Sequence, residues 1–380
     1  MADDRKGFLP KPVPHVWAPP VKCQGIKTKL VDFIGRSIAW NGSGRWVEPF
    51  LGSGVVLFNL CPERALVCDT NTHIIRLYQE IQSGAVTPRI VRDFLTENGT
   101  KLARDGAGFY YAVRRQFNEE GGSLRFLFLN RSCFNGVMRF NGKGGFNVPF
   151  GHKPKRFSKA YVTKITNQVA RAAETMTGRD WVFKTQPWNT TLDACTEGDF
   201  AYLDPPYIGR HTDYYNQWTD ADAEALARAA RNLRCGVALS MWKENKYREN
   251  GHLGEHWAGY VWRTFSHFYH VGPTEDLRNQ MTEVLAIRPG FEAATSPDAK
   301  PAGSPAEPAP HSSGPPCLKP SAVSRKPSAS SLPSSAQLAF VLRDASRARR
   351  GSPAGRRALA TSDAVMVSDK PARKRRTRKP

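Results

Sequence analysis

Four consecutive residues, Asp204-Pro205-Pro206-Tyr207, directly follow an apolar stretch, Phe200–Leu203, that we expect to be a strand. The prolines rigidify the backbone at the carboxyl end of this strand, where α/β folds bind their ligands. They leave the Asp204 carboxylate and the Pro205 carbonyl as adjacent acceptors, a pair that suits an exocyclic amino group. Tyr207 adds a flat ring on which a base can stack. A plain strand stop with a tyrosine at its rim is the simpler alternative.

A second pattern, at residues 46–54, places a glycine-rich turn between an expected strand and an expected helix. Gly52 and Gly54 let the backbone pass close to a ligand, and the helix that follows presents free N–H groups to it. The next expected strand ends at Asp69, whose carboxylate is well placed to bind ribose hydroxyls. Tight packing of the turn and a helix cap around Asp69 are the alternatives.

The segment Asn130–Lys159 is rich in glycine, asparagine and basic residues. Its cations are numerous enough to follow a phosphate backbone, and a solvated basic loop is the alternative. They are Arg131, Arg139, Lys143, Lys153, Lys155, Arg156 and Lys159.

Taken together, these motifs resemble those of the amino-methyltransferases that use S-adenosylmethionine, and most closely the Dam-type (D12 class, alpha group) adenine-N6 DNA methyltransferases. The resemblance covers nearly all of residues 20–290. It rests, in chain order, on Lys22-Cys23-Gln24-Gly25-Ile26-Lys27, Glu48-Pro49-Phe50-Leu51-Gly52-Ser53-Gly54, Asp69-Thr70-Asn71, Leu129-Asn130-Arg131-Ser132-Cys133-Phe134-Asn135-Gly136, Arg139, Asn141, Phe146-Asn147-Val148-Pro149-Phe150-Gly151 and Asp204-Pro205-Pro206-Tyr207.

The resemblance implies a cofactor site and a catalytic motif. Lys27 would point to the methionine carboxylate of S-adenosylmethionine, Asp69 would bind its ribose, and Asp204 would touch both cofactor and target base. The full cofactor set is Cys23, Lys27, Phe50, Gly52, Gly54, Asp69 and Asp204. The catalytic set is Asp204, Pro205, Pro206 and Tyr207.

The resemblance also implies a surface that reads DNA. Phe134 would wedge into the base stack, where an aromatic ring can fill the gap left by a flipped base. Arg139 would read a guanine, since its fork matches guanine O6 and N7 in the major groove. The expected DNA-contacting set is Asn130, Arg131, Phe134, Asn135, Val137, Arg139, Pro149, Lys153 and Lys155.

The function implied is transfer of a methyl group from S-adenosylmethionine to N6 of a flipped adenine in double-stranded DNA, in a GATC-like site. Two alternatives stay open: a non-catalytic regulator of the same fold that binds DNA or cofactor, and a methyltransferase acting on RNA or protein glutamine. We expect a monomer on DNA, in the cytoplasm with the nucleoid, alone or paired with a restriction endonuclease.

The elements that must position these residues alternate as strands and helices, which is typical of an α/β fold with a mostly parallel sheet. We expect strands at 46–48, 65–68, 181–184, 200–203 and 237–240, helices at 55–60, 72–81 and 220–233, and an antiparallel edge from 260–268 and 283–287. The fold class is a Rossmann-like methyltransferase. We divide it into residues 1–85, a mainly helical target-recognition insert at 86–161, a catalytic half at 162–290, and a tail at 291–380.

Composition limits which partners, metal sites and cellular locations we expect. The 380 residues carry a formal charge of +21, and residues 291–380 alone hold 17 Lys/Arg against 6 Asp/Glu, so a polyanionic partner is expected. The tail is rich in Pro, Ser and Ala, which predicts disorder. The seven cysteines form no C-x-x-C pair, and the histidines considered, at 73, 152, 211, 267 and 270, lack ligand spacing, so no metal is expected. Neither a membrane span nor a secretory signal is visible.

Overall fold

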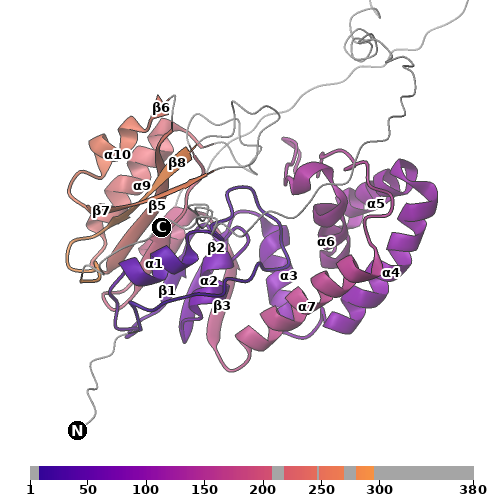
Figure 1. Cartoon of the computed structure of the whole chain (residues 1–380), viewed down its shortest axis with the longest axis horizontal. Coiled ribbons are helices and arrows are strands. Elements are labelled where there is room, and N and C mark those ends of the chain that lie inside the picture. Colours follow the sequence, from indigo (N-terminus) through magenta and orange to yellow (C-terminus); the bar gives the residue numbers. More distant parts are fainter. Residues whose placement is uncertain (1–7, 208–217, 246–247, 269–279, 295–380) are drawn as a thin grey trace, which may run out of the picture. The chain divides into compact units, whose positions relative to one another are not determined.

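A computed structural model describes residues 8–207, 218–245, 248–268 and 280–294, and all of these belong to one compact unit (Figure 1). The strands are β1 (Trp46–Glu48), β2 (Arg64–Asp69), β3 (Asp180–Thr185), β4 (Phe200–Leu203), β5 (Gly236–Asn245), β6 (Arg248–Glu249), β7 (Val261–Phe268) and β8 (Gln280–Ile287). The helices are α1 (Val31–Ser37), α2 (Val55–Leu60), α3 (Thr72–Gln82), α4 (Pro88–Asp105), α5 (Ala107–Glu120), α6 (Ser123–Ser132), the short 3-10 helix η1 (Phe134–Gly136), α7 (Lys159–Met176), α8 (Trp188–Asp193), α9 (Asp220–Asn232) and α10 (Gly251–His256). Each strand and helix expected from the sequence is confirmed.

The strands form one sheet in the order β3-β2-β1-β4-β5-β8-β7, with β6 paired to β5. Strands β1 to β5 run parallel, whereas β8 pairs antiparallel with both β5 and β7, so the expected antiparallel edge is confirmed. The chain leaves β1 toward β2 on one side and returns to β4 on the other. This reversal of strand order is where open α/β sheets bind ligands, at the carboxyl ends of the strands.

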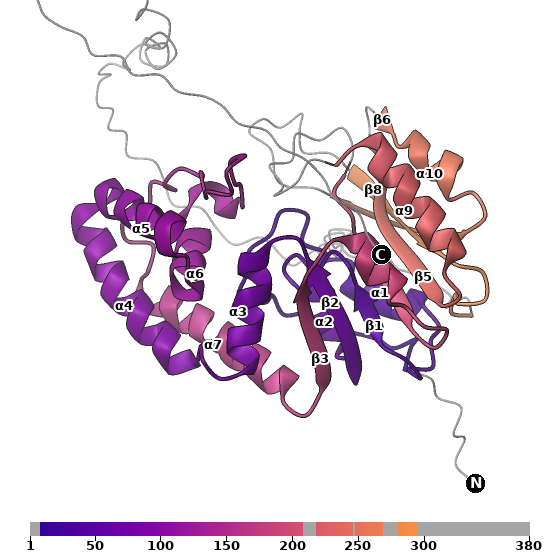
Figure 2. The same ribbon diagram turned by 180° about the vertical axis from the view of Figure 1, so that it is seen from behind.

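Successive residues of each central strand supply two hydrophobic cores, because side chains alternate between the faces of a sheet. Trp46 and Phe200 pack with helices α1, α2 and α3, whereas Val47 and Ala201 pack with α8, α9 and α10. Figures 1 and 2 show the sheet from its two sides, with α1 in front in one view and α9 and α10 in front in the other. The sheet is therefore covered on both faces, as a parallel sheet requires.

The insert is helical, as the sequence predicts, and consists of α4, α5 and α6 followed by an irregular hairpin. Helix α4 begins at a Thr87 cap with Pro88 in its first turn, and α7 begins at a Ser158 cap. Helix α7 continues past the expected boundary at residue 161 and packs against both α4 and α3. The insert thus has no boundary at 161, because one helix continues from it into the sheet-bearing part.

The expected tail begins too early at residue 291. Phe291 packs edge-on against Phe200, with ring centroids 6.0 Å apart, and its carbonyl accepts a hydrogen bond from Ala39 N. Ala293 N donates to the carbonyl of Ser37. Residues 291–293 are therefore part of the fold, and the prediction of disorder for 295–380 falls outside the described residues.

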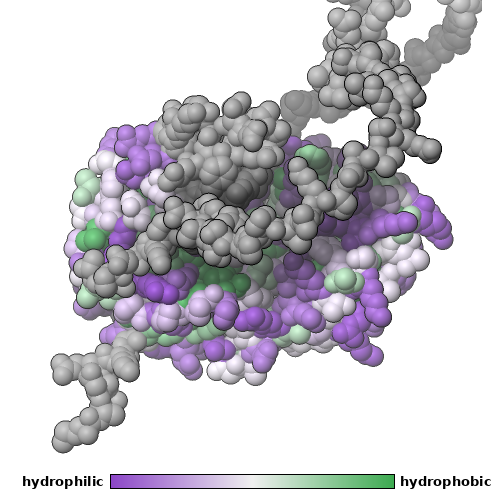
Figure 3. All heavy atoms as spheres, viewed as in Figure 1, coloured by the Kyte–Doolittle hydropathy of each residue, from purple (hydrophilic) through white to green (hydrophobic). Residues whose placement is uncertain are grey.

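Among the residues that the structure describes, no helix has the length and apolar character that a membrane crossing requires. Figure 3 shows that the side of the molecule formed by the insert is dominated by hydrophilic residues.

Candidate active site

One cavity collects the carboxyl ends of β1, β2 and β4. Its polar lining includes Glu48, Asp69 and Asp204, one from each strand end. The segment 23–27 closes it from the N-terminal side, and Met138 reaches it from the insert. The structure therefore brings together, in one place, all the residues expected at the cofactor and catalytic sites. The residues that line the cavity are Cys23, Lys27, Phe50, Gly52, Asp69, Asp204, Pro205, Pro206 and Tyr207. Gly54 does not line it and instead caps the N-terminus of α2, two residues after Gly52.

The glycine turn adopts a backbone that other residues rarely tolerate. Gly52 has a φ of 52° and Gly54 a φ of 73°, both in the left-handed region. A Cβ atom at Gly54 would lie 3.0 Å from the ring of Phe58, whereas one at Gly52 would meet only the Cys23 sulfur at 3.5 Å. Packing explains Gly54, and Gly52 keeps the turn open toward the cavity.

Asp69 fastens this turn to the end of the neighbouring strand. Its carboxylate accepts hydrogen bonds from Gly52 N at 2.9 Å and from Asn71 N at 2.8 Å. Burial raises the pKa of Asp69, and these backbone donors oppose the rise. The helix cap considered for this stretch belongs to Asn71, whose side chain accepts from His73 N at 3.1 Å. Asp69 is thus left to line the cavity.

Asp204 and Lys27 form an ion pair inside the cavity, with Nζ 2.8 Å from Oδ1. The Lys27 side chain is only 4% exposed, while that of Asp204 is 23% exposed. Burial lowers the pKa of Lys27, but the combined attraction of neighbouring groups, with Asp204 the strongest and Tyr207, Glu283 and Tyr202 adding to it, holds that pKa well above its usual value. Burial raises the pKa of Asp204, with Lys27 opposing the rise. The pair fixes one carboxylate oxygen and leaves the carboxylate at the cavity wall.

Tyr207 is anchored by a residue that sequence reasoning missed. Its hydroxyl donates to the Glu283 carboxylate on β8 at 3.2 Å, and the Lys27 ammonium lies 4.9 Å from its ring centroid. Burial raises the pKa of Tyr207, so its hydroxyl stays protonated. Glu283 is 6% exposed and stands in the apolar run of β8, which is the signal that could have revealed it.

Glu48 is a second missed residue. It is 3% exposed, accepts from the Trp46 indole N–H at 2.7 Å, and has its pKa raised by burial to about 8. The signal in the sequence that could have identified Glu48 is an acidic residue at the end of a short apolar strand. Glu48 is therefore protonated near neutral pH and adds a hydrogen-bonding group rather than a charge.

Aromatic rings form another part of the wall. Phe50 meets Trp218 edge-on at 5.5 Å, and Trp218 lies 6.4 Å from Trp188. Trp188 and Trp218 both line the cavity, and neither is among the site residues expected from the sequence. Cys23 also lines the cavity, and burial raises the pKa of its thiol and keeps it neutral. The wall is thus apolar between the polar strand ends.

The hairpin that begins with η1 and closes at Phe150 carries most of the expected DNA-contacting residues. Phe134 is 47% exposed, although it is a large apolar residue, and Asn135 beside it has a φ of 52°. Phe134 N donates to the Pro149 carbonyl at 2.9 Å, and Arg139 Nε donates to Asn147 Oδ1 at 2.8 Å. Val137 is half-buried, and Pro149, Lys153 and Lys155 are exposed.

Asn130 and Arg131 are a correction to the expected set. Asn130 is fully buried and exchanges two hydrogen bonds with the backbone of Lys22, at 2.8 and 2.9 Å. Arg131 is 4% exposed and donates to the Pro20 carbonyl at 2.8 Å and to Gln168. Both side chains hold the N-terminal segment against the insert, so they do not belong to a DNA-facing surface.

Comparison with known proteins gives the site its context. Residues 24–253 match the family model of the D12 class N6 adenine-specific DNA methyltransferases. A DNA adenine methylase of Vibrio cholerae is 33% identical over 238 residues, which is 59% of this chain and 80% of that protein. One of Serratia marcescens is 31% identical over 56% of this chain and 77% of its own length.

A third relative is less similar in sequence. The type II methyltransferase M.MjaIII of Methanocaldococcus jannaschii is 26% identical over 57% of this chain and 80% of its own length. The family match spans the glycine turn, the insert and the Asp204 motif that meet at the cavity. This chain therefore belongs to the D12 class of N6 adenine-specific DNA methyltransferases.

Proposed function

We propose that this enzyme transfers the methyl group of S-adenosylmethionine to N6 of an adenine flipped out of double-stranded DNA, within a GATC-like site. The observation that carries the proposal is the position of Asp204. Its carboxylate is held by Lys27 in the same cavity that the Gly52 turn and Asp69 line. A methyl donor bound at the turn and an amino group held by Asp204 would therefore share one enclosed space.

The chemistry of the lining fits S-adenosylmethionine. Asp69 offers carboxylate oxygens for ribose hydroxyls, and Gly52 leaves room for close approach of the backbone. Lys27 supplies a buried positive charge for a carboxylate, and Phe50 and Trp218 supply apolar surface. When bound, S-adenosylmethionine supplies a methyl group already activated by its sulfonium, so the transfer itself needs no metal.

Asp204 and Pro205 orient the acceptor amino group. With Oδ1 of Asp204 on Lys27, Oδ2 accepts one N6–H, and the Pro205 carbonyl accepts the other. These bonds favour the pyramidal form of an amino group whose lone pair is otherwise delocalised into the ring. They also stabilise the positive charge that grows on nitrogen as the methyl group arrives, which is the kind of preorganised electrostatic effect that dominates many enzymes. One N6 proton then leaves to solvent, so the product is neutral N6-methyladenine. Tyr207, fixed through Glu283, keeps its ring beside the base.

The hairpin selects the site. Arg139, steadied by Asn147, presents a fork to guanine, and Phe134 fills the stack where the adenine leaves. Asn135, Val137 and Pro149 shape the same hairpin, while the exposed Lys153 and Lys155 neutralise phosphates.

Long-read mapping of modified bases tests the proposal. DNA from a host lacking adenine methylation is compared with and without expression of this protein. We expect N6-methyladenine in one short motif containing GATC or a close variant. Methylation of cytosine, or no modified base alongside soluble folded protein, would overturn it.

A further inference from the structure

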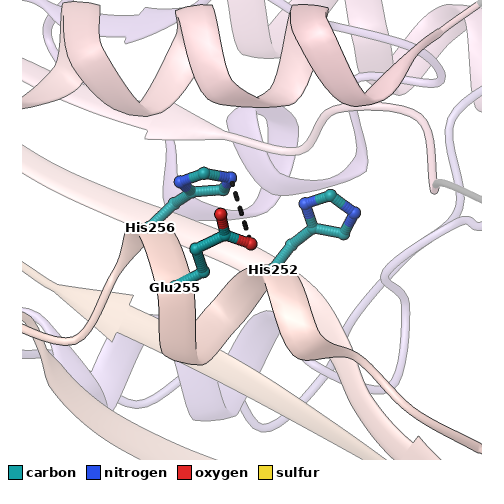
Figure 4. A group of neighbouring side chains, drawn as sticks. All are labelled: His252, Glu255 and His256. Atoms are coloured by element: carbon teal, nitrogen blue, oxygen red, sulfur yellow. Dashed lines mark ion pairs between the residues drawn. The ribbon is translucent and has the colours of Figure 1, made fainter.

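Helix α10, away from the cavity described above, carries three side chains with metal-binding atoms: His252, Glu255 and His256. One ligand atom from each lies within 4.8 Å of the other two. The spacing of three and four residues puts all of them on one face of the helix, and Figure 4 shows them gathered there. The two imidazole centroids are 5.6 Å apart, with their planes inclined at 31°. The cluster is therefore an arrangement of nitrogen and oxygen donors around a common point.

The distances inside the cluster leave room for an ion. His256 Nε2 lies 3.8 Å from Glu255 Oε2, which is too long for a hydrogen bond. Two ligands bound about 2 Å from a tetrahedral zinc ion are roughly 3.3 Å apart, so a small side-chain adjustment closes this pair on a metal. Glu255 is 70% exposed and free to make that adjustment, whereas His256 is 13% exposed and already fixed.

His252 is oriented by a carboxylate from another helix. Its Nε2 lies 2.9 Å from Oδ1 of Asp220, the first residue of α9. Its other nitrogen, Nδ1, is buried and has no hydrogen-bond partner among the described residues. In Figure 4 one ring nitrogen of His252 faces His256 and Glu255, and the other points away. A proton on Nε2 shared with Asp220 leaves the Nδ1 lone pair for a ligand, which is how carboxylates orient metal-binding histidines.

We propose that His252 Nδ1, Glu255 and His256 Nε2 bind a divalent first-row transition metal, best represented by Zn²⁺, with Asp220 orienting His252. Two imidazoles and one carboxylate are typical zinc ligands, whereas Ca²⁺ and Mg²⁺ prefer sites made of oxygen. Three protein ligands leave a coordination position for water. The expectation of no metal rested on the histidines at 73, 152, 211, 267 and 270. The separation of His252 and His256 by four residues was the available signal for a ligand pair.

The position of this site predicts what the metal does. It would tie α10 to the first residue of α9, and Trp218, only two residues earlier, lines the active-site cavity. We therefore expect a structural metal that stabilises this corner of the fold and takes no part in methyl transfer.

Metal binding by the full chain, prepared without a histidine tag and stripped with chelator, tests the proposal. Zn²⁺ is titrated against a competing chromophoric chelator, and Co²⁺ is used in parallel for its visible absorption. We expect one tight equivalent of Zn²⁺, a Co²⁺ spectrum with the intense bands of four-coordinate geometry, and a higher melting temperature with Zn²⁺. The double variant H252Q/H256Q should lose all three, and D220N should bind roughly 10- to 100-fold more weakly.

The exposed His15 provides the matched control, and H15Q should bind Zn²⁺ like the wild type. If the double variant does not fold, the Zn²⁺ stoichiometry and the Co²⁺ spectrum of the wild type still test whether the site binds a metal. Absence of a tight equivalent in the wild type, a six-coordinate Co²⁺ spectrum, or unchanged binding by a folded double variant would each overturn the proposal. None of these outcomes depends on whether the enzyme methylates DNA.

Discussion

The cavity and the hairpin differ in how far their side chains are buried and paired. In the cavity, charges are buried and paired, as Lys27 with Asp204, and hydroxyls are anchored, as Tyr207 on Glu283. On the hairpin, a large apolar ring, Phe134, is left 47% exposed. The cavity residues hold one another in place, whereas the hairpin leaves Phe134 at the surface, as the proposed contact with DNA requires.

The difference shows where each part obtains its rigidity. Strand ends and backbone donors hold the cavity, because methyl transfer requires fixed geometry. The hairpin instead rests on buried polar residues at its base, Asn130 and Arg131, which bind the backbone of the N-terminal segment. Basic character alone therefore does not mark a DNA contact in this insert, and the predictions below test that distinction.

The largest effect is expected at Asp204. Replacing it with alanine removes the acceptor that holds the amino group, and loss of one such preorganised group costs about 100- to 1000-fold in rate. Single-turnover methylation of a GATC duplex measures this, and fluorescence anisotropy measures duplex affinity, which should change little. Alanine also leaves the buried Lys27 ammonium without an acceptor. The amide oxygen of asparagine can still accept from Lys27, so D204N serves as the conservative control and should be nearly as inactive. Near wild-type rates in either variant would remove Asp204 from the chemistry.

Arg131 and Lys153 form a matched pair that separates scaffold from DNA contact. R131A should destabilise the fold by about 2–3 kcal/mol, because the Pro20 carbonyl and Gln168 lose their donor in a buried place. K153A should leave stability unchanged. It should also make the fall of log affinity with log salt less steep, by about one unit of slope. Urea unfolding and anisotropy at several salt concentrations give both quantities. The reverse pattern would mean that Arg131 faces DNA after all.

Arg139 should affect selectivity more than affinity. A guanine read by a bidentate arginine is discriminated by roughly 1–3 kcal/mol, so R139A should lose about tenfold or more of its preference at that base. Methylation of a library of site variants measures the preference. Lys143, exposed on the same hairpin, is the control, and K143A should keep the preference of the wild type. Identical site profiles for R139A and wild type would contradict the reading role.

The smallest effect concerns Glu48 and pH. Its pKa is raised to about 8, above the ordinary value of glutamate near 4, so the folded state holds an extra proton between these values. Stability should therefore fall as pH rises through this window, by on the order of 2 kcal/mol from pH 6 to pH 8. Urea unfolding should show this loss in the wild type and in the control E63Q, but not in E48Q. Equal pH dependence in E48Q would show that Glu48 ionises normally.

The sequence was enough to predict the parts of the site that depend on local signals. The glycine turn and Asp204 each follow a short apolar strand, and the strand order then places their carboxyl ends together. The contact between Tyr207 and Glu283 could not be predicted, because 76 residues separate them and the antiparallel edge that joins them has no fixed register in sequence. The burial of Arg131 also required the fold, since its acceptor at Pro20 lies 111 residues away.

The measurement that tests the central claim most directly uses purified enzyme, a GATC-containing duplex and S-adenosylmethionine labelled in its methyl group. After digestion to nucleosides, the label should elute with N6-methyl-2′-deoxyadenosine for the wild type, and within the same reaction time it should be almost absent for D204N. Label in another nucleoside, in protein, or in N6-methyl-2′-deoxyadenosine at equal yield from D204N would contradict the role given to the Lys27–Asp204 pair.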